Sequence, residues 1–359
     1  MSERTRIYPI FLPHQGCPFQ CIYCNQHAVT SASAGTQHSI SGLLAWFHER
    51  LQRLAEDSRR AGSPGEIAFY GGTFTALPSE IMQELLEGAS LLVREGLFTG
   101  IRFSTRPDCV TPLGCSLLCR YPVKTVELGV QSLSDDVLRT SGRGYSCRTV
   151  ETAAALVRSH GWSLGIQMMP GLPGDTRERF LESMRRVIAL RPDLARIYPT
   201  VVLSDTPLAE LYRRGGYQPL SLEEALSWCV PAYDALLRAG IPVARMGLHA
   251  DPELQKPGVI LAGPYHPSFG YLVRVHWWRD RVDGRIQKSR NAEEQKSRRQ
   301  KTGEPSARQL TIRVTQRQVS ELLGPDRSNI RYWKEKWQLT GIRIMQEPEW
   351  PLHRFECVK

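Results

Sequence analysis

The sequence contains no run of about eighteen apolar residues, so no membrane-spanning helix is predicted. It also lacks a secretory signal, because Pro9 and Pro13 interrupt the short apolar stretch that follows the polar first residues. It is not poor in apolar residues overall, since 41% are hydrophobic and 23% charged, which excludes disorder throughout. We therefore expect a folded cytoplasmic protein with no membrane partner.

A disulfide framework is not indicated by the nine cysteines, because the chain is long and carries no secretory signal. In such a chain, cysteines are free thiols, metal ligands or core residues. Their spacing is therefore more informative than their number.

Net charge is nearly absent from most of the chain. Residues 271–359 hold 20 Lys and Arg against 11 Asp and Glu, which is +9 of the total of +10. The same segment contains five of the eight tryptophans, namely Trp277, Trp278, Trp333, Trp337 and Trp350. Interleaved cations and flat rings predict a polyanionic partner for this segment.

Short β-branched runs alternate with longer amphipathic segments, a pattern typical of βα units around a parallel sheet. Six strands are predicted, at 7–12, 67–70, 101–105, 125–130, 164–169 and 195–201. Helices are predicted at 40–61, 78–95, 148–160, 176–190 and 222–239, and an extra strand at 242–248. The fold class is α/β, a partial (β/α)6 TIM-like barrel with a small α+β C-terminal module.

The domain boundaries follow from composition. The barrel is expected at 1–255, and a connecting segment at 256–284 begins where Pro, Gly and His become frequent. Residues 285–305 are almost entirely polar without periodicity, which predicts a flexible basic linker. Residues 306–359 are predicted to form the C-terminal module, with strands at 310–314 and 340–345 and helices at 316–323 and 329–337.

Three cysteines, in Cys17-Pro-Phe-Gln-Cys21-Ile-Tyr-Cys24, directly follow the first predicted strand. Their thiols therefore share one loop at the strand's carboxyl end, where βα barrels carry their active sites. Three thiolates leave one iron of a four-iron cube without a protein ligand, so a small chelating molecule can bind there. The alternatives are a zinc site completed by His14 or His27, or three reduced core thiols.

The spacing C-x3-C-x2-C, with Tyr23 before the last cysteine, resembles the signature of radical S-adenosylmethionine (SAM) enzymes. The resemblance implies that Cys17, Cys21 and Cys24 bind a 4Fe-4S cluster, that SAM binds the open iron, and that Tyr23 lies beside its adenine.

A second motif, Gly71-Gly72-Thr73, ends the second predicted strand, and its glycines let the backbone approach a ligand closely. It resembles the motif that contacts the SAM amino group in this superfamily. By itself, such a turn is more often only a tight loop.

Four further strings are similar to the radical SAM domain of the Elongator catalytic subunit: Ser104-Thr-Arg-Pro-Asp108, Glu127-Leu-Gly-Val-Gln-Ser132, Met168-Met-Pro-Gly-Leu-Pro-Gly174 and Arg196-Ile-Tyr-Pro-Thr200. The resemblance covers roughly residues 5–220. It implies reductive cleavage of SAM to methionine and a 5′-deoxyadenosyl radical. In that family the radical acts on carboxymethyl-type modification of the wobble uridine of transfer RNA.

The same resemblance assigns roles to single residues. It implies that Glu127, Gln131 and Arg106 are catalytic residues. Glu127 and Gln131 would line the cavity, and Arg106 would face the SAM carboxylate or the substrate. It further implies that Met169, Gly171 and Leu172 border the adenine. Local roles are the alternative, with Arg106 paired to Asp108, Gln131 capping a turn, and Met168 and Met169 in the core.

The sequence departs from that family after the barrel. Nothing of the size or pattern of an acetyltransferase domain follows residue 270, and Val243-Ala-Arg-Met-Gly-Leu-His249 replaces an Arg-rich strand. The chain thus looks closer to a shorter, bacterial Elongator-like form, of which Pro264-Tyr-His-Pro-Ser-Phe-Gly270 is typical. His249, Tyr265 and His266 are further candidates for donating a proton or hydrogen bond to substrate, with solvated side chains as the alternative.

The basic C-terminal region predicts a small RNA-binding module that resembles a KH fold, with transfer RNA or other RNA as its partner. The alternative is a charged surface over a core that buries the tryptophans. A one-electron donor such as ferredoxin or flavodoxin is also expected, because the cluster must be reduced before it acts on SAM.

Two other functions are alternatives. One is radical SAM chemistry on a small molecule such as a tetrapyrrole, as in the oxygen-independent coproporphyrinogen oxidases. The observed Gly-Gly-Thr-Phe-Thr departs from their usual Gly-Gly-Gly-Thr-Pro, which disfavours it. The other is a non-catalytic, zinc-bound, RNA-associated protein.

Overall fold

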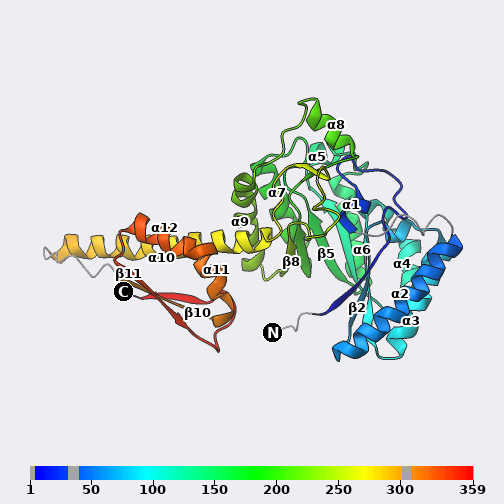
Figure 1. The fold of residues 1–359 in the computed structure, drawn as a ribbon, viewed down its shortest axis with the longest axis horizontal. Coiled ribbons are helices and arrows are strands. Elements are labelled where there is room, and N and C mark those ends of the chain that lie inside the picture. Colours follow the sequence, from blue (N-terminus) through cyan, green and yellow to red (C-terminus); the bar gives the residue numbers. More distant parts are fainter. Residues whose placement is uncertain (1–4, 31–39, 301–308, 359) are drawn as a thin grey trace. The chain divides into compact units, whose positions relative to one another are not determined.

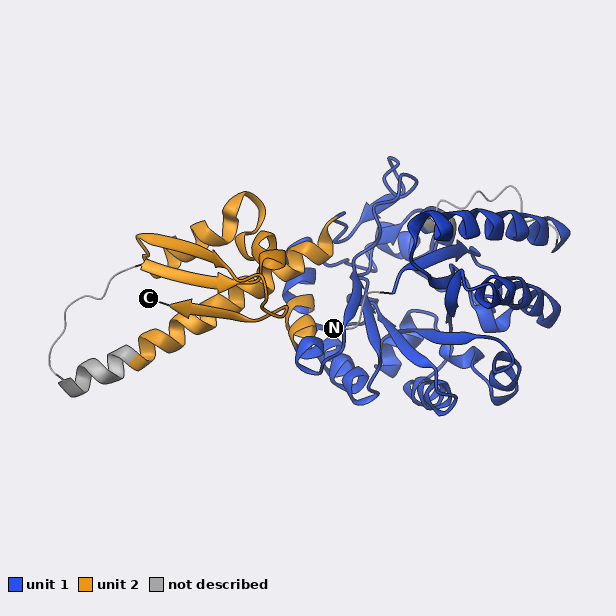
Figure 2. Cartoon of the chain, turned by 90° about the horizontal axis from the view of Figure 1, so that it is seen from below, with its two compact units in different colours: residues 1–228, 235–267 blue, residues 229–234, 268–359 orange. Residues whose placement is uncertain are grey.

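A computed structural model describes residues 5–30, 40–300 and 309–358 (Figure 1). The chain divides into two compact units, which Figure 2 colours separately. The first unit comprises residues 1–228 and 235–267, and the second comprises 229–234 and 268–359. The division at 267–268 lies within the connecting segment expected at 256–284.

Seven parallel strands form a half-barrel sheet in the first unit, in the order β1-β2-β3-β4-β5-β6-β8. They are β1 (Ile7–Phe11), β2 (Gly65–Tyr70), β3 (Phe98–Thr105), β4 (Val123–Gln131), β5 (Ser163–Met168), β6 (Leu194–Ile197) and β8 (Val243–Met246). The predicted partial barrel is confirmed. The extra strand expected near residue 245 is β8, which pairs with β6 and makes the sheet one strand wider than the six βα units.

Helices follow the strands, and α3 and α6 pack on β3 and on β4 and β5 (Figure 1). The helices of this unit are α1 (Gln26–Thr30), α2 (Ile40–Ala61), α3 (Ser79–Arg94), α4 (Pro112–Leu118), α5 (Asp135–Thr140), α6 (Cys147–Ser159), α7 (Arg177–Ala189), α8 (Pro207–Arg213) and α9 (Leu222–Arg238), part of which belongs to the second unit. Helix α2 buries Leu43, Phe47, Leu51 and Leu54 at helical spacing. A capping box of Ser221 and Glu224 begins α9.

The two faces of the sheet differ in polarity, because successive side chains of a strand point to opposite faces. On one face, Phe74 stacks between Phe69 and Phe103, with ring centroids 4.8 Å apart in both pairs. On the other face, Arg102 and Glu127 are buried and hydrogen-bonded to each other. The barrel interior therefore carries charge, whereas the layer beneath the helices is apolar. A short antiparallel pair, β7 (Val202–Leu203) and β9 (Ile260–Ala262), was not predicted.

The second unit contains the long helix α10 (Phe269–Gln300) and a three-stranded sheet of order β11-β10-β12. Its other elements are β10 (Gln309–Val314), α11 (Val319–Leu323), α12 (Ser328–Trp337), β11 (Gly341–Gln346) and β12 (Phe355–Val358). Strands β10 and β11 are parallel, and β12 runs antiparallel to β10. The predicted β-α-α-β order is present, and β12 is an addition to it.

Helix α10 corrects the prediction of a flexible linker at 285–305. Residues 285–300 are helical, and residues 301–305 lie outside the described part of the chain. The helix is anchored where Val275, Trp278, Val282 and Ile286 are buried. Beyond them the sequence is polar but contains no proline before residue 305, and Arg, Lys, Gln and Glu favour helix. The helix therefore continues without an apolar period, because helix propensity alone favours it there.

Candidate functional site

The three cysteines lie on the loop between β1 and α1, with Cys21 buried and Cys17 and Cys24 half-buried. The Cys17 N–H donates to the carbonyl of His14 at 3.2 Å, and the Cys24 N–H donates to that of Cys21 at 3.1 Å. Gly16 has a φ of 72°, and a Cβ there would lie 2.3 Å from the carbonyl oxygen of Thr73. The loop is therefore tight and needs glycine at this position.

The Gly71-Gly72-Thr73 turn at the end of β2 holds the cysteine loop. The His14 N–H donates to the carbonyl of Gly71 and the Thr73 N–H donates to that of Gln15, each at 2.9 Å. The Thr73 hydroxyl lies 3.3 Å from the Cys17 sulfur. The structure thus brings these predicted residues together with the cysteines.

Two guanidinium groups face the sulfur of Cys21. Nη1 of Arg143 donates to Sγ at 2.9 Å, and Nη1 of Arg106 lies 3.7 Å from the same atom. Arg106 also forms a two-point ion pair with Asp108, at 3.0 and 2.9 Å, so the local role considered for it is present. The sulfur of the central cysteine therefore lies beside two guanidinium groups.

The expected neighbours of the adenine pack beside the cysteines. Cys21, Tyr23 and Leu172 belong to one buried apolar cluster, against which Cys24 and Met169 pack. The phenol of Tyr23 accepts a hydrogen bond from Arg143 at 3.2 Å, and burial raises the pKa of Tyr23.

Gly171 lies at a turn in the same region that requires glycine. Its φ is 83°, and a Cβ there would meet the Leu220 side chain at 2.8 Å. Its N–H donates to the carboxylate of Asp175 at 3.1 Å, and its carbonyl accepts from the Tyr217 hydroxyl at 2.5 Å. These bonds hold the turn in one conformation.

Both carboxylate oxygens of Glu127 accept hydrogen bonds from buried neighbours. Oε1 accepts from the Tyr70 hydroxyl at 2.6 Å and from Arg102 at 2.9 Å, and Oε2 accepts from Arg196 at 2.6 Å. Burial alone would raise the pKa of Glu127, but Arg196, Tyr70 and Arg102 lower it below the ordinary value. Glu127 lies inside the barrel, as expected, as an ionised and fully bonded carboxylate.

Gln131 lies at the end of β4 in a left-handed conformation, with a φ of 70°. Its side-chain oxygen accepts from the amide of Gln167 at 3.3 Å, and its backbone carbonyl accepts from the Met169 N–H at 2.9 Å. Such a conformation is costly for a residue with a Cβ and is found most often at functional sites. Gln131 therefore links β4 to the Met169 segment.

The three thiols of the cysteine loop do not point to one common centre. In the described ranges, no three His, Cys, Asp or Glu side chains are grouped so as to hold a single metal ion. Burial raises the pKa of Cys24 to about 12, although the Gln26 amide donates to its sulfur at 3.3 Å. The ring Nε2 of His14, one of the zinc ligands considered, accepts from the Gln26 N–H at 3.0 Å, and the side chain of His27 lies outside the description.

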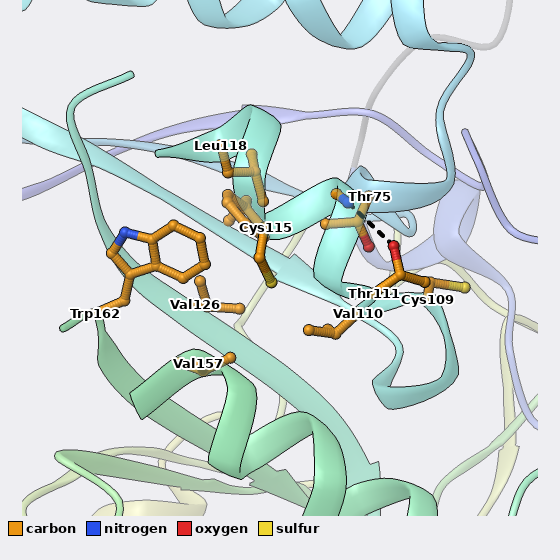
Figure 3. A pocket seen from close by; sticks show the side chains of 11 residues that line it. Thr75, Cys109, Val110, Thr111, Cys115, Leu118, Val126, Val157 and Trp162 are labelled. Carbon is orange, nitrogen blue, oxygen red and sulfur yellow. Dashed lines mark hydrogen bonds between the residues drawn. The ribbon is translucent and has the colours of Figure 1, made fainter. Parts of the chain in front are cut away.

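A small cavity lies on the apolar side of the sheet, between β3, β4, α4 and α6 (Figure 3). Its volume is about 10 Å³, room for at most one water. Leu118, Val126, Val157 and Trp162 line it, and Figure 3 shows the Thr111 hydroxyl bonded to the Gly114 N–H at its edge. This cavity is a packing gap of the helical layer and has no room for SAM.

The three weaker candidates are bonded locally. Nδ1 of the exposed His249 lies 3.3 Å from Arg245, and Tyr265 packs on an apolar cluster of Val201, Leu203 and Leu254. His266 is half-buried. The same apolar cluster includes Val29 of α1, the helix that follows the cysteine loop.

Most of the C-terminal tryptophans are core residues of the second unit. Trp277, Trp278, Trp333 and Trp337 are buried, so they have no face free for a base. Trp350 is half-buried, and the guanidinium carbons of Arg313 and Arg354 lie 5.3 and 4.4 Å from its ring centroid. Of the five tryptophans named from the sequence, only Trp350 is not buried.

No role was assigned from the sequence to three arginines, Arg102, Arg143 and Arg196, of which the first two are buried and Arg196 is half-buried. Arg143 stands between Gly142 and Gly144, both with positive φ, and Arg102 and Arg196 lie within predicted strands. A single charged residue inside an otherwise apolar strand was the available sign for Arg102, because such a residue needs a buried partner.

Known families match most of the chain. The Radical SAM superfamily matches residues 11–187, and the Radical_SAM C-terminal domain matches residues 192–278. The chain belongs to the radical SAM superfamily. It is accordingly a radical SAM enzyme, and this family membership implies a 4Fe-4S cluster and SAM.

Relatives of this radical SAM enzyme confirm the resemblance to the Elongator catalytic subunit. Elongator complex protein 3 of Saccharomyces cerevisiae is 32% identical over 56% of this chain and 42% of its own length. The tRNA uridine(34) acetyltransferase of Dehalococcoides mccartyi is 30% identical over 56% of this chain and 50% of its own length. The chain thus spans half or less of the length of these curated relatives.

A solved structure supports the fold of this radical SAM enzyme. The archaeal Elp3 of Methanocaldococcus infernus is similar over 63% of this chain and 56% of that chain, with 24% identity and a TM-score of 0.53.

Among the described residues, no helix is long and apolar enough to cross a membrane.

The donor set suits the group that the superfamily implies. Cys17, Cys21 and Cys24 offer three thiols on one loop at the carboxyl end of β1, and two guanidiniums stand beside the central sulfur. Thiolates are the ligands of iron-sulfur clusters, and each thiolate of a four-iron cube binds a different iron, so the sulfurs need not meet at one point.

Proposed function

We propose that this enzyme cleaves SAM reductively at a 4Fe-4S cluster held by Cys17, Cys21 and Cys24, and that its substrate is transfer RNA. The observation that carries the first part is the cysteine loop, whose central sulfur faces Arg143 and Arg106 beside the Gly71-Gly72-Thr73 backbone. When bound, the cluster supplies the electron that splits SAM into methionine and a 5′-deoxyadenosyl radical.

The chain's own residues then have distinct roles in this proposal. Tyr23, Met169 and Leu172 form an apolar wall beside the cysteines, which suits an adenine ring. Gly71 and Thr73 fix the cysteine loop through backbone bonds, and the same turn can receive the SAM amino group. Glu127 keeps the barrel interior ordered rather than exchanging a proton, because both of its oxygens are occupied.

Transfer RNA is proposed as substrate for two reasons. The relatives include proteins named tRNA uridine(34) acetyltransferase, although the chain covers only half of such a protein. The second unit is also basic, and Trp350 is a half-buried ring near Arg313 and Arg354, a combination of flat ring and cations that suits an unpaired base. Glu347 and Glu356 pair with Arg313, so the positive charge there is partly compensated.

The radical chemistry is tested with protein purified without oxygen, reconstituted with iron and sulfide, and reduced with dithionite. Chromatography then measures 5′-deoxyadenosine formed from SAM, with Cys21→Ala as control. We expect a product that depends on Cys21, and a ferredoxin or flavodoxin that replaces dithionite. Protein that takes up no iron and sulfide would overturn the proposal.

Substrate class is tested separately by filter binding of unmodified transfer RNA across a salt series. We expect affinity that falls steeply with salt, and a several-fold weaker affinity for Trp350→Ala with Trp350→Phe close to wild type. An absence of binding at low salt in the wild-type protein would overturn the RNA substrate and leave the radical chemistry standing.

A further inference from the structure

Phe19 is the most exposed aromatic side chain among the described residues, and it lies on the cysteine loop. The residue is 55% exposed, although it stands only two positions from both Cys17 and Cys21. Its neighbours Pro18 and Gln20 are also exposed, whereas Cys21 is buried and Cys17 is half-buried. The three residues between these cysteines are therefore the exposed part of the loop.

The Phe19 ring is held in place by a buried cation. The guanidinium carbon of Arg106 lies 5.3 Å from the ring centroid, and Asp108 binds that guanidinium at two of its nitrogens. Arg106 itself is 4% exposed, so it contacts the ring from the interior. The ring is thus fixed on one side and open to solvent on the rest of its surface.

The segment at 142–144 adds no side chain to the surface around Phe19. A Cβ at Gly144 would lie 3.7 Å from the Phe19 ring, and one at Gly142 would lie 3.3 Å from Ile22, so both glycines stand beside the loop. Both are exposed. The Phe19 surface is therefore uncharged, and it consists of Pro18, Phe19, Gln20, Gly142 and Gly144.

This surface suits a protein partner better than a nucleic acid. Nucleic acids are bound through exposed Lys and Arg that contact phosphates, and the Phe19 surface has neither. The cations behind it, Arg106 and Arg143, are buried. Protein interfaces carry aromatic side chains at a centre depleted of charge, and the complexes of electron-transfer proteins are small. One exposed ring on a small uncharged surface meets both conditions.

We infer that the Phe19 surface is the docking site of the protein that delivers the electron to the cluster. This inference rests on the proposed function, because it needs a cluster bound by Cys17, Cys21 and Cys24. One electron passes from the reduced carrier to the oxidised cluster, so the carrier is oxidised by one electron, the cluster is reduced by one, and no bond forms or breaks. Electron transfer slows steeply with distance, and a carrier docked at Phe19 sits against the stretch that joins two cluster ligands.

The test compares protein carriers with a small reductant on the reconstituted enzyme. Stopped-flow absorption measures how fast the cluster is reduced by reduced flavodoxin, by reduced ferredoxin and by dithionite, which needs no docking site. Phe19→Ser removes the ring and Phe19→Tyr keeps it. Leu113→Ser is the matched control, because Leu113 is 83% exposed and lies in helix α4. Iron and sulfide content is measured in every sample, and only loaded proteins are compared.

We expect Phe19→Ser to lower the second-order rate constant with the carriers about tenfold, as the loss of a central interface residue does. The rate with dithionite should not change, and Phe19→Tyr and Leu113→Ser should match wild type. A second pair of variants leaves the ring intact. Flavodoxins and ferredoxins are acidic, so Gln20→Glu should slow both carriers and Gln20→Lys should speed them, with a difference that shrinks as salt is added.

Equal carrier rates for wild type and Phe19→Ser would overturn the inference, as would an equal slowing with dithionite, because the ring would then only hold the loop. A loaded wild-type cluster that neither carrier reduces would also overturn it. If Phe19→Ser bound transfer RNA more weakly at unchanged carrier rates, the surface would belong to RNA. Where Phe19→Ser loads no cluster, equal carrier rates for the two Gln20 variants decide against the inference. Wild-type protein that binds no cluster would instead overturn the proposed function.

Discussion

Arg196 and Glu127 form a two-point ion pair inside the barrel, with Nε 2.6 Å from Oε2 and Nη2 3.2 Å from Oε1. Oε1 also accepts from Arg102, which in turn pairs with Glu66, so two guanidiniums and two carboxylates alternate across β2, β3, β4 and β6. The interior is therefore charged but balanced. A balanced buried network of this kind tolerates the loss of one member poorly.

Replacing Glu127 by Gln should cost about 3 to 5 kcal/mol of unfolding free energy, because it leaves Arg102 and Arg196 buried with one carboxylate between them. Urea unfolding followed by circular dichroism measures the loss. Glu151→Gln is the matched control, since Glu151 is about half exposed and pairs with Arg186 at 2.8 Å, and it should cost less than about 1 kcal/mol. Similar losses for the two variants would show that Glu127 does not hold the interior.

Gly72 is the residue at which a single methyl group should displace the cysteine loop. A Cβ there would lie 2.2 Å from the carbonyl oxygen of Gln15 and 2.8 Å from that of Leu12, and both are backbone atoms that cannot swing aside. Gly72→Ala should therefore cost about 1 to 3 kcal/mol and reduce the iron bound per chain after reconstitution. Gly284→Ala is the control, because a Cβ at Gly284 meets nothing within 4 Å and lies in helix α10, where alanine favours the fold. Normal iron binding by Gly72→Ala would show that the loop adapts.

The fold was predictable where hydrophobic periodicity was strong. Helix α2 begins and ends where the sequence predicted it, and the strands around Ile67 and Ile101 were placed within a few residues. Both results follow because the spacing of apolar residues along the sequence shows which residues are buried. The polar part of α10 and the short strand β12 carry no such spacing. The first follows from helix propensity without an apolar period, and β12 depends on pairing with β10, which lies far from it in the sequence.

The site was predictable to the extent that its residues form short motifs. Cys17, Cys21 and Cys24 are close in sequence, and Gly71 to Thr73 form one turn. Their spacing alone was therefore enough to predict them as site residues. Arg143 is 122 positions from Cys21, and Arg196 is 69 positions from Glu127. Contacts between such distant positions arise only from the closure of the sheet, and no local pattern reports them.

Trp333 and Trp350 should respond in opposite ways to truncation. Trp333 is fully buried in the second unit, so Trp333→Ala should cost about 3 to 5 kcal/mol, as removal of a core aromatic side chain does. Trp350 is half-buried and contacts Arg313 and Arg354, so Trp350→Ala should cost less than about 1 kcal/mol. Thermal unfolding followed by tryptophan fluorescence and circular dichroism measures both. If Trp350→Ala unfolded the protein as readily, its effect on RNA binding would say nothing about stacking.

Asp175 should make the stability of the folded chain depend on pH between about 4 and 7. Burial raises its pKa from 3.8 to about 6, although the N–H groups of Gly171 and Thr176 and the charge of Arg179 oppose the shift. For an acid whose pKa is higher in the folded chain, the stabilising contribution is fully present below the unfolded value and is lost as pH rises through the folded value. Ionisation of Asp175 thus destabilises the folded chain, because the cost of burying the charge exceeds the gain from the N–H groups that bond to it.

The measurement is the unfolding free energy of wild type and of Asp175→Asn in urea at several pH values. Asparagine does not ionise, so it gives a constant offset from its lost acceptor, and only the pH-dependent part of the difference reports Asp175. We expect the advantage of wild type over the variant to shrink by about 2 kcal/mol from pH 4 to pH 7. A difference that stays level would mean that the carboxylate remains ionised and well solvated in the folded chain, and that the Gly171 turn is held by its backbone bonds alone.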